Sequence, residues 1–308
     1  MKLGLLRCLL FYPLGPFWET FFAELGFSVV VSPVSTRETF DQTRRRFSGD
    51  ICLPVESAAS HLLSLGSTVD LVFIPKLTDR RDDLYICPVC AGLPFVIEQS
   101  FPEAPPLLSI QLTPFSPPGR EATTALAAHG CSSKSIAKAY ASACHRYSEM
   151  EYSWTASHVP ALHQKRILLL GMPYVVSDPL IHAGLPDILS KRNCHVSTAL
   201  NIAPQSAFNR VYVEGYPLYW AFAGMSVHAL SLALQTSRPD GVLYLSSFAC
   251  GVDSVVVPIV QSVCRRCEDL PFLLLTVDEH ASAAHMEVRV EAFLDCIEAD
   301  IRRKRAQT

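Results

Sequence analysis

Short apolar segments alternate with helical patterns along this chain, and this order restricts the fold more than any other feature. A strand is predicted at residues 3–10 and a second at residues 28–32. Between them lie a turn at Pro13 and Pro16 and a helical stretch at residues 17–25. Strands that alternate with helices are typical of parallel, doubly wound sheets. The opening segment therefore predicts the first βαβ unit of an α/β protein.

The same order begins again near Lys165, where residues 166–171 read as a new first strand. Asp240 leads into an apolar strand at residues 241–245, much as Asp70 leads into one at residues 71–75. We therefore predict two Rossmann-like α/β domains with mainly parallel sheets and a cleft between them. The predicted domains are an N-terminal domain at residues 1–130, a bridging helix and linker at 131–164, and a C-terminal domain at 165–308.

Further elements follow from apolar periodicity and from residues that begin or end helices. Thr36 is a predicted cap for a helix that begins near Arg37, and Gly66 a predicted stop. The other predicted helices lie at residues 57–65, 132–153, 179–191 and 288–301, and the other predicted strands at residues 196–199 and 273–277.

Composition narrows the classes of partner. Charged residues make up only 18% of the chain, the formal net charge is -3, and the mean hydropathy is +0.24. A chain without a basic field is a poor candidate for nucleic-acid binding. No apolar run approaches the roughly 20 residues needed to span a bilayer. The apolar start is interrupted by Arg7 and does not resemble a signal peptide, so the cytoplasm is the expected location.

The chain has eleven cysteines, a large number for a protein of the cytoplasm. A small buried thiol is the expected role of those that fall inside predicted strands and helices or just before a strand. Cys264 and Cys267 form a C-x-x-C within a predicted helix and are interpreted as surface or packing residues. The cysteines given a packing role are Cys8, Cys144, Cys194 and Cys296, while Cys131 lies in a loop and carries little information.

Four other cysteines lie after strands or at turns: Cys52, Cys87, Cys90 and Cys250. The carboxyl ends of strands carry ligands in open α/β sheets, and a thiol near a helix start is biased toward the thiolate. Thiolates suit iron–sulfur clusters and zinc. The C-x-x-C of Cys87 and Cys90 also permits a thioredoxin-like role, which requires the motif at a helix start. Gly92 argues against a long helix running on from Cys90.

Several motifs together resemble a known family, the activase-related proteins of the 2-hydroxyacyl-CoA dehydratase system that contain the domain of unknown function DUF2229. The likeness extends over nearly the whole chain. The motifs that carry it include Pro16-Phe17-Trp18, Cys52-Leu53-Pro54-Val55, Cys87-Pro88, Gly92-Leu93-Pro94, Gly171-Met172-Pro173-Tyr174, Phe248-Ala249-Cys250-Gly251 and Asp278-Glu279-His280.

The resemblance implies a [4Fe-4S] protein with Cys52, Cys87 and Cys250 as the ligands of the cluster. Cys90 lies outside the family pattern and is interpreted as a fourth ligand, a spare thiol or a packing residue. The family pattern has Lys-Leu-Ala-His after Cys-Leu-Pro-Val, whereas this chain has Glu56-Ser57-Ala58-Ala59. The resemblance also implies an ASKHA-type activase ATPase as the electron donor. No ATPase motif of this kind is recognised in the chain itself.

Asp278, Glu279 and His280 follow a predicted strand and are the candidate catalytic residues, either as support for the cluster or as proton donors. An acidic loop that caps the next helix is the alternative. His61 is interpreted as an interior histidine with satisfied hydrogen bonds.

Three functions stay open at this point. The first is ATP-driven, low-potential electron transfer or reduction of a small or CoA-linked substrate. The second is a non-catalytic cluster module that docks on a larger activase or dehydratase complex. The third is a zinc-bound α/β binding protein. A second copy of the chain is a further candidate partner, whereas nucleic acid and membrane are not expected.

Overall fold

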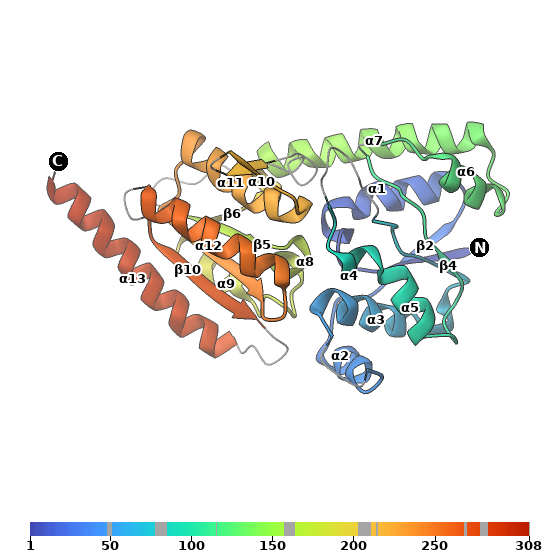
Figure 1. Cartoon of the computed structure of the whole chain (residues 1–308), viewed down its shortest axis with the longest axis horizontal. Coiled ribbons are helices and arrows are strands. Elements are labelled where there is room, and N and C mark those ends of the chain that lie inside the picture. Colours follow the sequence, from blue (N-terminus) through green and yellow to red (C-terminus); the bar gives the residue numbers. More distant parts are fainter. Residues whose placement is uncertain are drawn as a thin grey trace. The chain divides into compact units, whose positions relative to one another are not determined.

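The computed structural model describes residues 1–47, 51–77, 85–114, 116–156, 164–202, 211–213, 215–267, 270–277 and 283–307. These residues form two compact units, each with its own parallel sheet (Figure 1). The first unit lies within Met1–Arg81 and Tyr85–Trp154, and the second within Thr155–Thr308. The predicted fold class, α/β with two mainly parallel sheets, is confirmed.

The sheet of the first unit has four parallel strands in the order β2-β1-β3-β4. Its register pairs Leu3 with Val29 on one side and with Leu71 on the other. The central strands are almost entirely buried, as expected for a parallel sheet covered on both faces. The strands are β1 (Lys2–Leu5), β2 (Ser28–Val31), β3 (Leu71–Phe73) and β4 (Leu107–Leu108).

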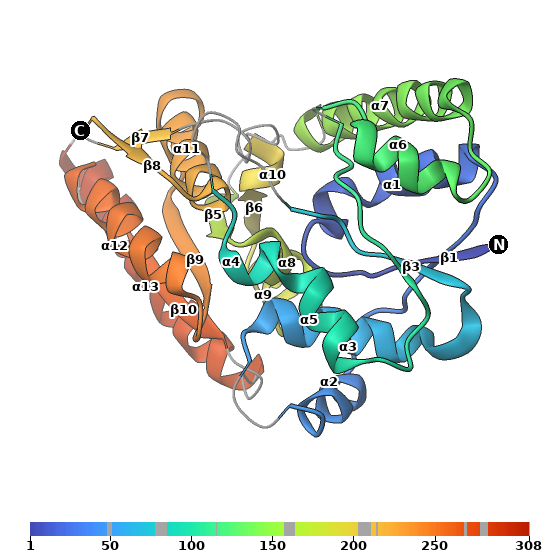
Figure 2. The ribbon, with the colours of Figure 1, turned by 45° about the vertical axis from the view of Figure 1, so that its right-hand side comes forward.

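Helices cover both faces of this sheet (Figure 2). Helices α1, α6 and α7 lie on one side, and α2, α3 and α5 lie on the other. The helices are α1 (Phe11–Glu24), α2 (Arg37–Arg44), α3 (Leu53–Leu65), α4 (Pro88–Ala91), α5 (Leu93–Ser100), α6 (Arg120–Ala127) and α7 (Ser133–Ala156), with a short 3-10 turn η1 (Gly66–Thr68) after α3.

Aromatic side chains of α1 form much of the first core. The rings of Trp18 and Phe22 contact Phe73 of β3 edge to face, with centroids 5.2 and 4.9 Å apart. The indole N–H of Trp18 donates to the carbonyl of Leu112 at 2.9 Å, so its polar group is satisfied in the interior. Each fully buried aromatic side chain of this kind contributes about 1.5–3 kcal/mol of hydrophobic stabilisation.

The turn predicted at Pro13 and Pro16 is wrong, because α1 already begins at Phe11 and includes both prolines. Pro13 falls in the first turn, where its missing N–H has no partner within the helix in any case. Pro16 lies in the interior of the helix, where it removes one backbone hydrogen bond. The free energy gained by burying the aromatic residues that follow outweighs this loss. The first strand is correspondingly shorter than predicted and ends at Leu5.

The sheet of the second unit also has four parallel strands, in the order β10-β9-β5-β6. The strands β7 and β8 form a separate antiparallel pair. The strand β9 is buried along its whole length. The strands are β5 (Lys165–Gly171), β6 (Cys194–Thr198), β7 (Val211–Val213), β8 (Tyr216–Leu218), β9 (Gly241–Ser247) and β10 (Phe272–Val277).

In this unit α11 and α12 pack against each other, and so do α9 and α13. Gly241 at the start of β9 allows α13 to approach closely, since a Cβ there would come within 2.5 Å of the Ile297 side chain. The helices are α8 (Pro173–Ser177), α9 (Leu185–Lys191), α10 (Ala199–Ile202), α11 (Ala221–Thr236), α12 (Gly251–Arg266) and α13 (Ala283–Gln307).

The two sheets share one strand order. In each, the first strand (β1 or β5) lies between the second (β2 or β6) and the third (β3 or β9), and the fourth (β4 or β10) pairs with the third. The aspartates noted in the sequence occupy matching places. The Asp70 carboxylate accepts the backbone N–H of Lys2 at 2.7 Å, and the Asp240 carboxylate accepts that of Arg166 at 2.7 Å. Each aspartate thus fixes the start of the third strand against the start of the first. This repeat supports the interpretation of two related halves.

Other predictions differ in detail from the structure. The helix predicted at residues 179–191 begins only at Leu185, because Asp178 accepts the N–H groups of Leu180 and Ile181 and holds a turn before it. Helix α11 had no counterpart among the predicted elements. The predicted domain boundaries at residues 130 and 164 stay predictions. In the described part of the chain, no helix is long and apolar enough to cross a membrane.

Candidate functional site

Three of the four cysteines proposed as ligands share one structural position, the residue that caps the start of a helix. Cys52 caps α3, Cys87 caps α4 and Cys250 caps α12. The first backbone N–H groups of a helix have no partner within it, and they favour negative charge nearby. A thiol at this place is biased toward the thiolate that binds metals.

The local sequence explains these helix starts. Proline stands in the first turn after Cys52 and directly after Cys87, where its fixed φ suits a helix and its missing N–H costs nothing. Gly251 follows Cys250, and the Cys250 sulfur accepts the backbone N–H of Asp253 at 3.4 Å. Each cysteine is half-buried, so its sulfur is held by the fold and still reached from solvent.

The Cys87 thiol is biased toward the thiolate form. A hydrogen bond from the Cys90 side chain lowers the pKa of Cys87 to about 5, and the backbone N–H groups of Val89 and Cys90 act in the same direction against the cost of burial. Cys90 itself is 5% exposed. Cys87 is therefore the accessible thiolate of the C-x-x-C, and Cys90 is the buried thiol behind it.

Cys52 lies close enough to Cys87 for their charges to interact. Burial raises the pKa of Cys52, and the thiolate of Cys87 raises it further, while the backbone N–H of Val55 opposes both effects. A nearby cation or metal would remove this mutual repulsion. The first unit thus brings together Cys52, Cys87 and Cys90 from the starts of two helices.

In the second unit, Cys250 adjoins a buried polar network that sequence reasoning missed. The Tyr244 hydroxyl donates to the Asp253 carboxylate at 2.8 Å, and the backbone N–H of Ser247 donates to its other oxygen at 3.2 Å. Asp253 is 1% exposed, and burial raises the pKa of its carboxyl. The sequence features that could have indicated this network are a tyrosine within the otherwise aliphatic strand β9 and an aspartate three residues after Cys250.

Cys87 and Cys250 have equivalent places in the two sheets. Cys87 caps the first helix after β3, and Cys250 caps the helix after β9, the third strand of its own sheet. In this strand order the ligand crevice lies between the first and third strands, at their carboxyl ends. Each unit therefore presents a half-buried cysteine at the end where α/β sheets bind ligands.

The second C-x-x-C motif differs sharply from the first. Cys264 is fully buried within α12, and burial raises its pKa to about 12, while Cys267 follows the end of the helix. The packing role predicted for this pair fits the place of Cys264. None of the eleven cysteines, all of which the structure describes, takes part in a disulfide.

His61 has the interior role predicted for it. It is 1% exposed, its Nδ1 lies 3.0 Å from the Ser32 hydroxyl, and its Nε2 lies 3.1 Å from the Ser35 hydroxyl. The candidate catalytic residues Asp278, Glu279 and His280 lie outside the described residues, so their roles stay predictions.

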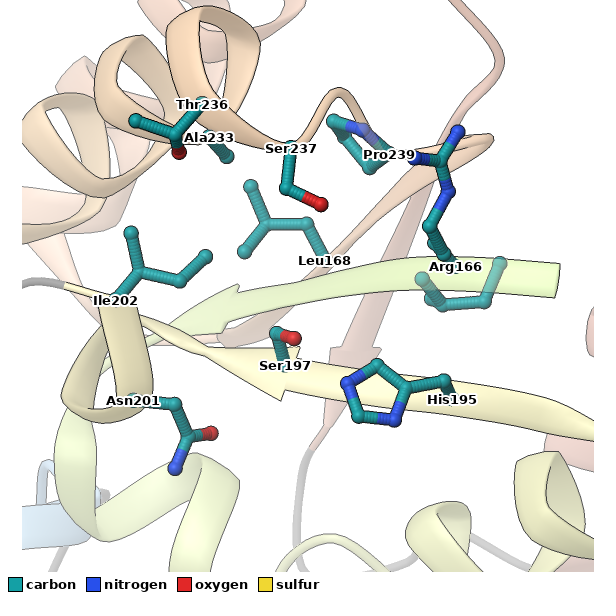
Figure 3. A pocket seen from close by; sticks show the side chains of 11 residues that line it. Arg166, Leu168, His195, Ser197, Asn201, Ile202, Ala233, Thr236, Ser237 and Pro239 are labelled. Atoms are coloured by element: carbon teal, nitrogen blue, oxygen red, sulfur yellow. The ribbon is translucent and has the colours of Figure 1, made fainter. Parts of the chain in front are cut away.

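A pocket of about 110 Å³ in the second unit has no cysteine in its lining (Figure 3). Figure 3 shows Leu168 of β5 with His195 and Ser197 of β6, and Thr236 and Ser237 at the end of α11. The pocket is lined by residues of β5, β6, α10 and the end of α11, and Cys250 is not among them. The pocket is therefore distinct from the site at Cys250.

The donor chemistry fits a thiolate-bound metal centre, since the candidates are half-buried cysteines at helix starts. Within the described ranges, no three His, Cys, Asp or Glu side chains are already arranged as a metal site. The half-buried cysteines are therefore the candidate ligands of such a centre.

Fold and site together define a class: a protein of two doubly wound α/β units with half-buried cysteines at the ligand-binding ends of their sheets. The family model described as "CoA enzyme activase uncharacterised domain (DUF2229)" matches residues 2–202, about two thirds of the sequence, and the chain belongs to this family. The match includes Cys52, Cys87 and Cys90 and ends before Cys250. A search of curated proteins finds no match.

Proposed function

We propose that this protein binds a [4Fe-4S] cluster through cysteine thiolates and takes part in low-potential electron transfer within the CoA enzyme activase system. The observation that carries the proposal is that Cys52 and Cys87, each half-buried at the start of a helix, lie near enough for their charges to interact. Membership of the activase family supports the biological setting.

Cys52 and Cys87 would hold the cluster from the first unit, and Cys250 is the ligand taken from the second. When bound, such a cluster supplies one-electron chemistry, with a potential set by nearby hydrogen bonds and by exposure to solvent. The chain supplies the hydrogen bonds. The N–H of Asp253 donates to the Cys250 sulfur at 3.4 Å, and the backbone N–H groups of Val55 and Val89 lower the pKa of the Cys52 and Cys87 thiols. Such donors stabilise thiolates and tune the bound group.

Cys90 decides how many thiolates take part. Its side chain donates to Cys87, so in the metal-free protein it acts as a hydrogen-bond donor to a ligand. Three thiolates leave one iron open for a small or CoA-linked substrate, whereas four favour electron transfer alone. We propose the three-thiolate set, with Asp278, Glu279 and His280 as the catalytic residues. An ASKHA-type ATPase on another chain would deliver the electron, in the reducing cytoplasm where thiols persist.

The proposal is tested by purification without oxygen, followed by iron, sulfide and zinc analysis and by EPR after dithionite reduction. We expect about four irons and four sulfides per chain and the EPR signal of a reduced cluster. Reduction by the partner ATPase with ATP then tests the electron-transfer role. Zinc in place of iron would refute the redox function and favour a zinc-bound α/β protein. A cluster that the ATPase reduces but that affects no substrate, with Cys90 as a fourth ligand, would favour a docking module.

A further inference from the structure

One face of the second sheet forms the floor of the pocket in Figure 3. The parallel register places Arg166 beside His195 and Leu168 beside Ser197. Side chains two residues apart on a strand point to the same face of the sheet, so these four lie together on one side of β5 and β6. The floor of the pocket therefore carries one aliphatic and three polar side chains.

The two helices α10 and α11 form the walls over this floor. Helix α10 contacts both strands and α11. Asn201 and Ile202 line the pocket from α10, and Ala233 and Ser237 line it from the end of α11. Leu168 on the floor and Ala233 on the wall are almost fully buried, so the pocket extends to the core of the unit.

The polar and aliphatic side chains lie at different ends of the pocket. Figure 3 shows Ile202 and Ala233 at one end and Arg166 and His195 at the other, with Ser197 between them. A ligand that fits this arrangement has a hydrocarbon part at one end and a polar group at the other.

The polar part of the lining favours a ligand that accepts hydrogen bonds and carries negative charge. Asp240 holds the Arg166 guanidinium through Nε at 3.4 Å and one terminal nitrogen at 3.1 Å, and a guanidinium has five N–H donors. The Asn201 Oδ1 accepts the backbone N–H and the hydroxyl of Thr198, both at 2.8 Å, which leaves the amide nitrogen as a donor. Among the described residues, no carboxylate lines the pocket.

The volume of the pocket limits the ligand to a few atoms. An apolar cavity of about 150 Å³ holds a benzene molecule, so a pocket of about 110 Å³ has room for about four or five non-hydrogen atoms. Acetate and propionate have this size, and each combines a carboxylate with a short hydrocarbon part.

We propose that this pocket binds a short-chain carboxylate. The carboxylate group lies against Arg166 and Ser197, and the hydrocarbon part lies against Ile202 and Ala233. The site contains none of the candidate cysteines, so it does not depend on the proposed function. A ligand bound here joins the sheet to α10 and α11 and stabilises the second unit.

The experiment uses the full-length protein and propionate as the probe. Propionamide has nearly the same shape without the charge and is the comparison. Binding is measured by saturation-transfer NMR and by the melting temperature, both at constant ionic strength. We expect a Kd on the order of 1 mM for propionate and binding at least about tenfold weaker for propionamide. Propionate at about ten times its Kd should raise the melting temperature by a few degrees.

Variants at Ser197 test the location of the site. Ser197→Ala should weaken propionate binding about tenfold, because a hydrogen bond to a charged group is lost. Ser197→Leu fills the pocket and should abolish binding, and Ser197→Ala alone decides the question if the leucine variant does not fold. Ser231→Ala is the matched control, because Ser231 is exposed on α11 outside the pocket lining. This variant should bind propionate like the unmodified protein.

The proposal is overturned if propionate gives neither saturation transfer nor a higher melting temperature, or if propionamide binds as well as propionate. Unchanged binding in Ser197→Ala, or lost binding in a folded Ser231→Ala, would also overturn it, because the ligand would then occupy another place. Iron content has no part in this test, so failure of the proposed function leaves its result intact.

Discussion

Replacement of Asp253 tests whether the network beside Cys250 holds the second unit together as its geometry implies. Asp253→Ala removes the acceptor of two buried donors, the Tyr244 hydroxyl and the Ser247 backbone N–H. A buried donor left without a partner costs about 1–3 kcal/mol. We therefore expect a loss of about 2–4 kcal/mol in the free energy of unfolding of this unit.

Ser254→Ala is the matched control, since Ser254 is the next residue on α12 and is exposed, with its hydroxyl bonded to Gly251. We expect this variant to lie within about 0.5 kcal/mol of the unmodified protein. A loss of about 2 kcal/mol raises the equilibrium constant for unfolding roughly 30-fold. Hydrogen exchange measured by mass spectrometry on β9 peptides resolves such a change, while β1 peptides of the first unit serve as an internal reference.

The pH dependence gives a second, independent reading. Burial raises the pKa of Asp253, so the folded protein holds this proton more tightly than the unfolded chain. The stabilisation is complete below the unfolded pKa of about 4 and declines as the pH rises through the folded value. In the metal-free protein, the gap in stability between unmodified protein and Asp253→Ala should therefore narrow as the pH rises above the unfolded pKa of about 4. Equal stability of Asp253→Ala and Ser254→Ala across this pH range would refute the reasoning.

Three further predictions concern single positions. Gly171→Ala should cost at least about 3 kcal/mol, measured by urea unfolding, because φ is +147° and a Cβ would meet a backbone oxygen of β9 at 2.3 Å; a smaller loss would mean that this backbone yields. In the reduced, metal-free protein, alkylation of Cys87 should rise to its plateau as the pH passes about 5, whereas Cys264, with a pKa of about 12, should resist at neutral pH. Peptide mass spectrometry checks this, and equal rates would contradict it. Asp240→Ala should lower the melting temperature more than Asp70→Ala, because Asp240 also binds the Arg166 guanidinium; the reverse order would contradict a stabilising contribution from this ion pair.

Much of the architecture could be predicted from local patterns because the strands are short, apolar and regularly followed by helices. Asp70 and Asp240 marked equivalent strand starts, and Thr36 marked a helix start that its hydroxyl does cap, accepting the N–H of Thr39. Helix α1 was misplaced because Pro13 and Pro16 were read as breakers. Their cost is outweighed by aromatic burial that appears only in the folded core.

Helix α11 was missed for a related reason. Its residues are apolar and small on nearly all sides, so its sequence has little helical periodicity. Burial between the sheet and α12 stabilises it, and this burial depends on contacts between distant parts of the chain.

For the site, sequence reasoning placed these cysteines after strands or at turns, with Cys52 just before a helix, and did not identify Cys87 and Cys250 as the residues that begin helices. It did not identify the partners of these thiols. The electrostatic interaction of Cys52 with Cys87 joins residues far apart in the chain, and the pairing of Tyr244 with Asp253 depends on the turn from β9 into α12. Such contacts arise from tertiary packing and leave no local signal.

The most direct test of the central claim is the iron content of single cysteine variants after anaerobic reconstitution. Cys52→Ala and Cys87→Ala should lose most of the iron, and Cys250→Ala should lose it as the third ligand. Cys296→Ala, whose thiol is exposed on α13, should keep about four irons per chain and is the matched control. Equal iron in all four variants, or iron in none of them nor in the unmodified protein, would contradict the account.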